Sequence, residues 1–338
     1  MVAQSQARPQ AGTGHRGARP PIDPDLLRVM AGRDDIVTTL RAEDIPALRA
    51  TSVTYSDAEL TANGLLELTR HRVPGHDGED RQLVLLRPRG AESAPVIYHV
   101  HGGGLVVGTP TDVLPALGAL AHRVGMAVAA IDYRLAPEHP HPAAVEDVYA
   151  GLVWLAAHAS DLRLDPDRII IEGVSAGGGL AAAAALLARD RGGPAILGQM
   201  LICPMLDDRN DSASGHQMTG YGSWDRTANH TAWTAYLGEL SPGEVPVYAA
   251  PARATDLSGL PPAFIDVGSA ETFRDEDVAY AARIWAQGGD AELHVWPGGV
   301  HGFDALAPDA ALSIDAVEAR VRWLTRILGR TTPSAPTR

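Results

Sequence analysis

The chain has 338 residues, 45% of them hydrophobic, and carries a formal net charge of -13 from 41 acidic and 28 basic residues. Because an acidic surface repels phosphate backbones, we expect no nucleic-acid partner. All the basic residues are arginine, which excludes a lysine Schiff base and the lysine contact of a P-loop, and the single cysteine, Cys203, excludes an internal disulfide and a cysteine-based zinc site.

Both ends of the chain are polar, and we expect no fixed structure in residues 1–21 and 331–338. The first of these segments lacks the apolar core of a secretory signal. No run approaches the roughly 20 apolar residues of a membrane helix. We therefore expect a cytoplasmic protein without a membrane span, built as a short helical segment at 22–52 and one large domain at 53–330.

The first predicted elements are two short helices and a pair of strands. Residues 23–32 and 42–50 each place an acidic residue near the start and keep an apolar face, which predicts helices. Residues 64–73 and 81–90 predict paired strands at a sheet edge, because the segment between them, PGHDGED, holds strong turn formers.

From residue 94 onward, strands and helices alternate along the chain. This rhythm is typical of α/β proteins and predicts a mostly parallel sheet with helices on both faces. The expected strands are 95–100, 126–133, 168–174, 198–204, 262–268 and 291–298, and the expected helices are 111–124, 143–159, 176–190, 275–287 and 311–328.

Residues 206–251 interrupt this rhythm. The segment has no clear strand, predicts a helix at 226–238, and holds Trp224, Trp233 and Tyr236 in a chain only 5% aromatic. Because it is inserted between two core strands, we expect it to form a lid over a site. The three aromatic residues are candidates for the substrate pocket, and plain packing of the helix is the alternative.

A serine flanked by glycines joins strand 168–174 to helix 176–190. Such a junction needs a tight, strained turn, and Gly173 and Gly177 remove the side chains that would collide there. Ser175 is then exposed at the carboxyl ends of the strands, where ligands of parallel sheets bind. This is the pattern of the nucleophile elbow, Gly-x-Ser-x-Gly. The alternative is a glycine-rich turn with a helix-capping serine, and the strand and helix on either side favour the elbow.

Consecutive glycines follow strand 95–100 in the stretch HVHGGGLVVGT. Backbone N–H groups of such a loop can point into a cavity and hold the oxyanion that develops in acyl transfer. The candidate donors are Gly103 and Gly104, together with Ala176 from the elbow. A phosphate-binding loop is the alternative, but lysine is absent and the spacing differs from Gly-x-Gly-x-x-Gly before a helix.

A candidate base, His301, lies in the Gly-flanked loop WPGGVHGFDA after the last expected strand. The chain has 13 histidines, and a lone histidine is more often structural than catalytic. Chain order favours His301, because α/β-hydrolases place the serine first, the acid second and the histidine last.

The acid should come from the segment after strand 262–268. Asp266 lies inside that strand, and Asp275 and Glu276 fall in the first turn of the next helix, where acids are ordinary partners of the helix dipole. Glu271 lies in the loop between the two, from which a side chain can reach the His301 loop. We therefore choose Glu271.

Together these motifs resemble the hormone-sensitive-lipase-like (bacterial family IV) esterases, a branch of the α/β-hydrolases. The resemblance covers roughly residues 53–328 and rests on HGGG at 101–104, YRLAPEHPHPAAVED at 133–147, GVSAGGG at 173–179 and HGF at 301–303. It implies an α/β-hydrolase fold whose helical cap is formed by segments 22–52 and 206–251. It also implies a structural role for the 133–147 motif beneath the oxyanion loop.

The resemblance implies the roles of the site residues as well. The nucleophile falls on Ser175, the base on His301, and the acid on Glu271 of ETFRDE, where relatives usually have Asp. The chain departs from the family at Val174, since relatives commonly have Asp or Thr before the nucleophile. The implied oxyanion donors are again Gly103, Gly104 and Ala176.

The expected activity is that of a serine carboxylesterase acting on short- to medium-chain esters through an acyl-enzyme on Ser175. This chemistry requires neither metal nor cofactor, its partner is a small-molecule ester, and the resemblance implies a homodimer. Two alternatives stay open: an amidase or arylformamidase with the same triad, and a receptor-like member of the fold that binds a ligand without catalysis. The presence of Ser175, Glu271 and His301 favours catalysis.

Overall fold

The structure, a computed structural model, describes residues 18–51 and 53–329. The expected tails at 1–21 and 331–338 lie outside these ranges except for residues 18–21, which form neither helix nor strand. Within the described ranges, no helix is long and apolar enough to cross a membrane.

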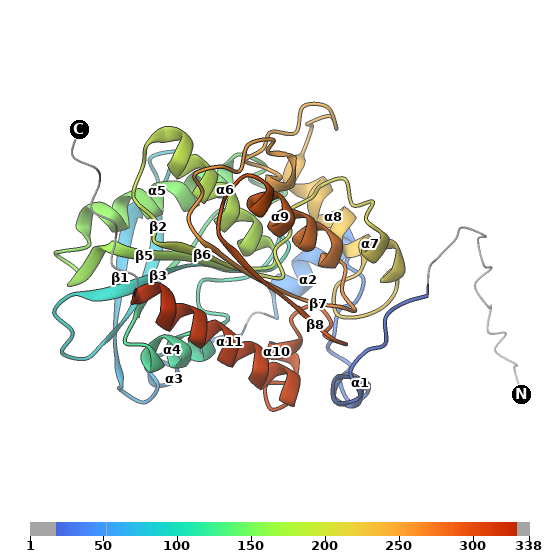
Figure 1. Ribbon diagram of the computed structural model, residues 1–338, viewed down its shortest axis with the longest axis horizontal. Coiled ribbons are helices and arrows are strands. Elements are labelled where there is room, and N and C mark those ends of the chain that lie inside the picture. The colour runs from blue at the N-terminus through green and yellow to red at the C-terminus, as the bar shows by residue number, and fades with distance from the viewer. Residues whose placement is uncertain (1–17, 52, 330–338) are drawn as a thin grey trace, which may run out of the picture.

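An eight-stranded sheet runs through the centre of the described part of the molecule (Figure 1), in the order β1-β2-β4-β3-β5-β6-β7-β8. β1 pairs with β2 and β2 with β4 in antiparallel fashion, and all the pairs from β4 to β8 are parallel. This confirms the predicted α/β class with a mostly parallel sheet. The strands are β1 (Leu66–Pro74), β2 (Asp80–Pro88), β3 (Ala94–Val100), β4 (Ala127–Ile131), β5 (Leu164–Val174), β6 (Gly198–Ile202), β7 (Ala263–Gly268) and β8 (Ala291–Trp296).

Helices cover both faces of the sheet. In Figure 1, α5, α6 and α9 lie on one face, and α4 and α11 lie side by side on the other. The helices on each face pack against the strands and bury a separate cluster of apolar side chains. The bounds are α4 (Leu114–Arg123), α5 (Ala143–His158), α6 (Ala176–Arg191), α9 (Arg274–Ala286) and α11 (Ala311–Leu328).

The central elements are apolar along their whole length because they are covered on both sides. All seven residues of β3 are buried, as expected of a strand in the middle of a two-sided sheet. Helix α6 is buried from Ala176 to Ala188, and its alanines and glycines let the backbone approach β5 and β6 closely. A Cβ added at Gly178 would lie 2.9 Å from Pro204 Cβ. The small residues of α6 therefore let the helix lie close to the sheet, with Ser175 directly before its first residue.

Two segments far apart in sequence lie together above the strand ends. The first holds η1 (Ala42–Asp44) and α2 (Ile45–Arg49), and the second holds α7 (Ala213–Gln217) and α8 (Arg226–Leu237). The helix before them, α1 (Pro24–Ala31), packs instead with Phe303 and Ala307. The two segments are joined by hydrogen bonds from Asp225 N to Thr38 O (3.0 Å) and from Thr231 Oγ1 to Leu40 O (2.8 Å). The expected helices at 23–32, 42–50 and 226–238 are present within a residue or two.

Several short helices were not expected from the sequence. They have three to five residues each, too few to display a helical period. They are α3 (Asp57–Leu60), α7, η2 (Pro251–Arg253) and α10 (Phe303–Leu306).

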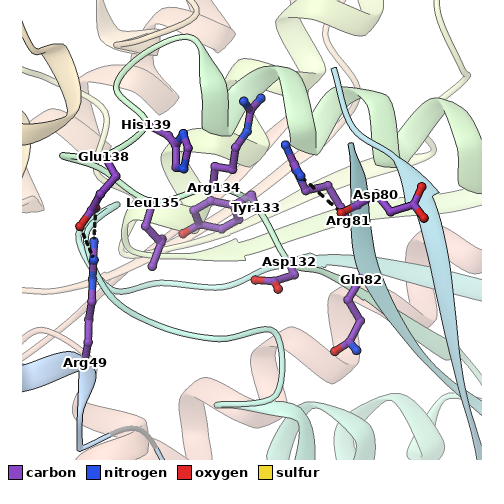
Figure 2. A pocket seen from close by; sticks show the side chains of 10 residues that line it. All are labelled: Arg49, Asp80, Arg81, Gln82, Asp132, Tyr133, Arg134, Leu135, Glu138 and His139. Carbon is purple, nitrogen blue, oxygen red and sulfur yellow. Dashed lines mark hydrogen bonds and ion pairs between the residues drawn. The ribbon is translucent and has the colours of Figure 1, made fainter. Parts of the chain in front are cut away.

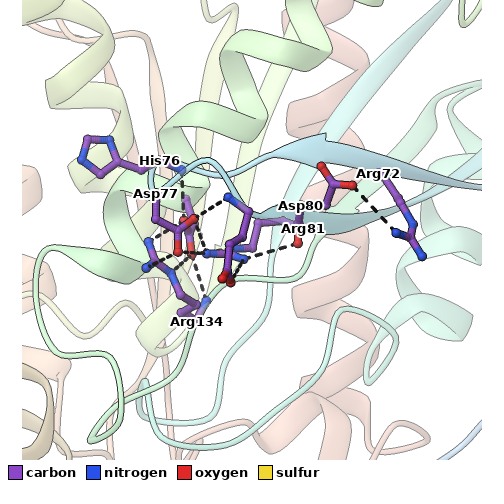
Figure 3. A network of polar contacts seen from close by, with 8 residues as sticks. Arg72, His76, Asp77, Asp80, Arg81 and Arg134 are labelled. Atoms are coloured by element: carbon purple, nitrogen blue, oxygen red, sulfur yellow. Dashed lines mark hydrogen bonds and ion pairs between the residues drawn. The ribbon is translucent and has the colours of Figure 1, made fainter.

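A network of ion pairs holds the 133–147 motif against the β1–β2 hairpin (Figure 3). The buried carboxylate of Asp147 accepts from Arg81 Nε (2.9 Å) and from Arg134 Nε (2.7 Å), and Asp77 pairs with both arginines. Tyr133 OH donates to His101 O at 2.8 Å. These contacts support the structural role that the family resemblance implies for this motif.

Candidate active site

Ser175 sits at the junction of β5 and α6 in a backbone conformation that few residues adopt, with φ 58° and ψ -121°. Its N–H donates to Ile202 O (2.8 Å), and its carbonyl accepts from Met205 N (2.9 Å). A Cβ at position 173 would lie 2.2 Å from Gly177 O, and one at position 177 would lie 2.0 Å from Val100 O. The flanking glycines are therefore required sterically, as the elbow pattern predicts.

The structure brings Ser175, His301 and Glu271 into one chain of hydrogen bonds. Nε2 of His301 lies 2.9 Å from Ser175 Oγ, and Nδ1 lies 2.8 Å from Glu271 Oε2. In the neutral imidazole with the proton on Nδ1, Nδ1–H donates to the carboxylate and Nε2 accepts from the serine hydroxyl. The same geometry leaves Nε2 able to take the hydroxyl proton.

The buried carboxylate of Glu271 is held on its second oxygen, where Oε1 accepts from Phe273 N at 2.8 Å. The ring of Phe273 meets the ring of His301 edge to face, with centroids 5.2 Å apart. Both contacts restrict the two side chains to the geometry in which they bond each other. They arise because the loop between β7 and α9 returns close to the loop that carries His301.

The other three acids of this region have different partners. Asp275 accepts from Ser214 N (2.8 Å) and pairs with Arg274, and Glu276 accepts from Leu206 N (2.8 Å). Asp266 lies inside β7 and accepts from Arg320 Nε (2.9 Å). No hydrogen bond from these three to His301 is found among the described residues.

The glycine loop after β3 forms one wall of a cavity above Ser175. Gly103 and Gly104 have φ of 108° and 61°, and Gly103 O accepts from both Val106 N and Val107 N. A Cβ at position 103 would lie 2.1 Å from Val107 O, so this turn requires glycine. Ala176 stands in the first turn of α6, where N–H groups have no acceptor within the helix.

His101 fixes the start of this loop without carrying charge. Its ring stacks on Tyr133 with centroids 4.1 Å apart, and Nδ1 lies 2.8 Å from Gly102 O. Burial lowers the pKa of His101 to about 3, so the imidazole is neutral at ordinary pH and Nδ1–H donates to the Gly102 carbonyl. His101 therefore orders the glycine loop, and nothing places it as a base.

The cavity above Ser175 has a volume of about 450 Å³. Trp224 forms part of its wall beside Gly104, whereas Trp233 and Tyr236 lie in the hydrophobic core and do not line it. Tyr236 instead has its hydroxyl 3.1 Å from His141 Nδ1. Residues that the sequence did not single out complete the wall, and they come from the N-terminal segment and the glycine loop: Leu48, Thr51, Val53, Val107, Asp112 and Val113.

Cys203 lies beneath the site. Burial raises the pKa of its thiol well above the ordinary value, and the negative charge of Glu271 raises it further, so the thiol stays protonated. In the described part of the chain, Cys203, Glu271 and His301 bring possible metal-ligand atoms within 4.8 Å of one another. Two of the three already bond along the chain from Ser175, so this cluster belongs to the same site.

A second cavity of about 490 Å³ lies beside the 133–147 motif (Figure 2) and is lined by arginines and acids. Arg49 of α2 donates from Nη1 to Glu138 Oε1 (2.8 Å), from Nη2 to Ala136 O (2.7 Å) and from Nε to Val106 O (2.7 Å). Neither Ser175 nor His301 lines this cavity. Arg49 and Glu138 pair within the wall, and Arg81 and Arg134 pair with Asp77 and Asp147 outside it. We assign this cavity a structural role.

Comparisons with known proteins show the family to which this chain is similar. A family model described as the α/β hydrolase fold matches residues 97–305. The chain is 36% identical to Carboxylesterase NlhH of Mycobacterium tuberculosis over 92% of this chain and 98% of that protein, and 37% identical to Carboxylic ester hydrolase LipN of the same organism over 77% and 70%. The solved structure of Bacterial Heroin Esterase superposes with a TM-score of 0.82 at 36% identity, covering 92% of this chain and 98% of that one.

Proposed function

Because this chain belongs to the hormone-sensitive-lipase-like branch of the α/β-hydrolase fold family and is a carboxylic ester hydrolase, we propose that Ser175 is its nucleophile, His301 its base and Glu271 its acid. The observation that supports this assignment is the chain of two hydrogen bonds, 2.9 Å from Ser175 to His301 and 2.8 Å from His301 to Glu271. The order of the three residues along the chain is the one that this fold uses.

The first half of the proposed reaction forms an acyl-enzyme. Nε2 of His301 takes the hydroxyl proton while Ser175 Oγ bonds to the ester carbonyl carbon, and the carbonyl electron pair moves onto oxygen. When this oxyanion collapses, the bond to the alcohol oxygen breaks and the alcohol leaves with the proton from His301. Water then gives a proton to His301 while its oxygen bonds to the acyl carbon. The bond from that carbon to Ser175 Oγ breaks, the proton on His301 passes to Oγ, and the carboxylic acid leaves.

Glu271 acts through His301 and does not touch the ester. Its carboxylate accepts the Nδ1 proton, which keeps Nε2 facing Ser175, and it stabilises the imidazolium that forms in each half-reaction. The side chain is 1% exposed, so water screens this interaction little. These steps require no metal or cofactor.

The proposed oxyanion donors are the backbone N–H groups of Gly103, Gly104 and Ala176. They border the nucleophile from two sides, the first two from the glycine loop and the third from the first turn of α6. A donor aimed at the developing negative charge contributes about 3 kcal/mol of transition-state stabilisation.

We propose short- to medium-chain carboxylic esters as the substrates. The cavity above Ser175 is small, about 450 Å³, and its wall is largely apolar with few polar groups, as is usual for a site that takes a small organic molecule. The same triad attacks amides, so amide hydrolysis stays the alternative reaction.

The decisive experiment is labelling with a p-nitrophenyl alkylphosphonate, followed by peptide mapping. One phosphonyl group per chain on Ser175 is expected, because the reagent captures an activated serine nucleophile. Ser175→Ala should not be labelled, and its kcat for p-nitrophenyl butyrate should fall at least about a thousandfold. Ser258→Ala, which changes an exposed serine that does not line the cavity above Ser175, is the control and should match the wild type.

Two outcomes would contradict the assignment. Ester turnover by Ser175→Ala within tenfold of the wild type would place the nucleophile elsewhere. A folded wild-type protein that takes no label would support a ligand-binding role for this site in place of catalysis.

The remaining sequence-based expectations stay predictions. We propose that the N-terminal segment 22–52 and the insertion 206–251 form the cap, supported by the hydrogen bonds between them and by the contribution of Leu48 and Trp224 to the wall of the cavity. A homodimer and a cytoplasmic location were expected from the resemblance and the composition, and neither is tested by the fold.

A further inference from the structure

Four consecutive residues of the insertion, 222–225, lie directly before the first residue of α8, and we call them the cap tether. Thr38 Oγ1 donates to Gly222 O (2.6 Å), and Asp225 N donates to Thr38 O (3.0 Å). The buried carboxylate of Asp225 also accepts from Ala228 N (2.8 Å) in the first turn of α8. Both ends of the tether are therefore fixed by the two segments that we propose as the cap.

The two middle residues of the tether bond to the loops that carry the proposed base and acid. Ser223 Oγ donates to the backbone carbonyl of His301. The carbonyl of Trp224 accepts from Thr272 Oγ1 at 2.7 Å, and Thr272 directly follows Glu271 in the chain. One short segment of the cap is thus hydrogen-bonded to both of these loops.

The loop that carries His301 has few side chains of its own to fix its backbone. Three of the five residues from 298 to 302 are glycines, which have more conformational freedom than other residues. The ring of His301 must stay 2.9 Å from Ser175 Oγ and 2.8 Å from Glu271 Oε2, and a shift of the backbone at His301 changes both distances. A misplacement of about 1 Å can cost a reaction a hundredfold. A hydrogen bond that holds the His301 carbonyl therefore bears on the rate.

We propose that Ser223 is a positioning residue for His301, and that through it the cap holds the base in its reactive place. This inference rests on the proposed triad. Ser223 is not among the described residues that line the cavity above Ser175, so it acts through His301 and not on the ester. Its loss should therefore lower kcat by the same factor for every ester and leave KM unchanged.

The test is Ser223→Ala, assayed with p-nitrophenyl acetate and p-nitrophenyl butyrate. For both esters kcat should fall about three- to tenfold, the usual effect of one lost hydrogen bond. The rate constant for phosphonate labelling of Ser175 should fall by the same factor, because labelling also requires His301 to take the serine proton. Ser223→Thr keeps the hydroxyl and should restore kcat to within about twofold of the wild type.

A matched control removes a different serine hydroxyl from the same insertion. Ser241 donates to Glu244 in the loop after α8, and neither residue belongs to the tether or lines the cavity above Ser175. Ser241→Ala should therefore match the wild type in kcat, in KM and in the rate of labelling.

A second variant tests the other bond of the tether. Thr272→Val keeps the shape of this buried side chain and removes the hydroxyl that donates to Trp224 O. It should also lower kcat without raising KM. The double variant Ser223→Ala/Thr272→Val should lose less than the product of the two single losses, because both changes release the same segment.

The outcomes separate this inference from the proposed function. If Ser223→Ala and Thr272→Val both keep the wild-type kcat and the wild-type rate of Ser175 labelling, the positioning role is wrong and the triad stands. A rise in KM at constant kcat would also overturn it, because Ser223 would then act on ester binding. Absence of ester turnover and of Ser175 labelling in the wild type would instead refute the proposed triad.

Discussion

At Ser175 a strained backbone is held in place by its neighbours. A non-glycine residue with φ near 58° costs on the order of 1–3 kcal/mol and persists where the surroundings determine it. Here the hydrogen bonds to Ile202 O and from Met205 N fix the turn on both sides. In this backbone conformation the hydroxyl of Ser175 lies 2.9 Å from His301 Nε2, the contact on which the proposed chemistry depends.

The choice of Glu271 over Asp275 yields a sharp prediction. Removing the carboxylate that orients a catalytic histidine leaves the ring in the wrong tautomer, with a loss of about ten-thousandfold in kcat in serine proteases. Glu271→Gln should approach that loss. Asp275→Asn removes only an acceptor for Ser214 N and a partner of Arg274, and should cost at most about a hundredfold. Steady-state kinetics of both variants, with circular dichroism as the check on folding, decides between them.

The reverse result would move the acid to the start of α9. If Asp275→Asn is the inactive variant and Glu271→Gln retains most of its kcat, the 2.8 Å contact between Glu271 and His301 is not the one that orients the base.

The sequence predicts a site residue well when the reason for that residue lies in its neighbours along the chain. Gly103, Gly173 and Gly177 must be glycine because a Cβ there would lie 2.0–2.2 Å from a backbone oxygen. These glycines form short motifs around Ser175 and in the loop after β3, so they are visible in the sequence. Val113 carries no such mark. Its place in the wall of the cavity above Ser175 depends on how α4 packs against β4 and α11, which no local pattern reveals.

Among the elements, the insertion 206–251 shows the same limit. Trp233 and Tyr236 are three residues apart on α8 and share the helix face that carries Ala228, Asn229 and Ala232, all buried. Trp224 precedes the helix and lines the cavity. The helical period of 226–238 places Trp233 and Tyr236 on one apolar face and would have indicated that they pack in the core. The expectation for all three aromatic residues rested on composition alone, which does not distinguish Trp224 from the other two.

This difference predicts opposite effects for two tryptophan variants. A Cβ at Gly104 would lie 2.5 Å from Trp224, and the Trp224 ring centroid is 6.3 Å from that of His301, the residue that protonates the leaving alcohol in the proposed reaction. Trp224→Ala should therefore raise kcat/KM for bulky-alcohol acetates relative to ethyl acetate, with a small change in Tm. Trp233→Ala should leave that ratio unchanged and lower Tm, because emptying a buried tryptophan site costs about 3–5 kcal/mol.

Kinetics with the two ester types and thermal melts on both proteins provide the measurement. If Trp224→Ala lowers Tm strongly and leaves the alcohol preference unchanged, Trp224 serves only to pack the helical segment.

For the molecule as a whole, the overall fold is the best predicted level. Each long strand and helix was expected from its alternation, because burial on both faces of the sheet dictates continuous apolar runs such as β3 and the interior of α6. The interior ionisable groups could not be predicted, since an aspartate on a helix looks the same whether it faces water or the core. Asp277 of α9 is such a group: it is 0% exposed, and neither carboxylate oxygen has a hydrogen-bond partner among the described residues.

The last prediction concerns this carboxyl and the pH dependence of stability. Burial raises the pKa of Asp277 well above its ordinary 3.8, and the nearby charges of Glu276, Glu271 and Asp266 raise it further. Between the ordinary and the raised pKa, the native state keeps a proton that the unfolded state has lost, so this group lowers the free energy of unfolding as pH rises through that window.

The variant Asp277→Asn has no carboxyl to ionise, so it does not lose free energy of unfolding in this way as pH rises. Its Tm should exceed that of the wild type at pH 8, by about 2–4 °C for each kcal/mol, and the gap should shrink as pH falls toward 3.8. Thermal melts from pH 4 to 8.5 measure the gap, with the exposed Asp309→Asn as a control that should show none. A gap that stays constant with pH would mean that the carboxyl of Asp277 has the same pKa in the folded and unfolded states.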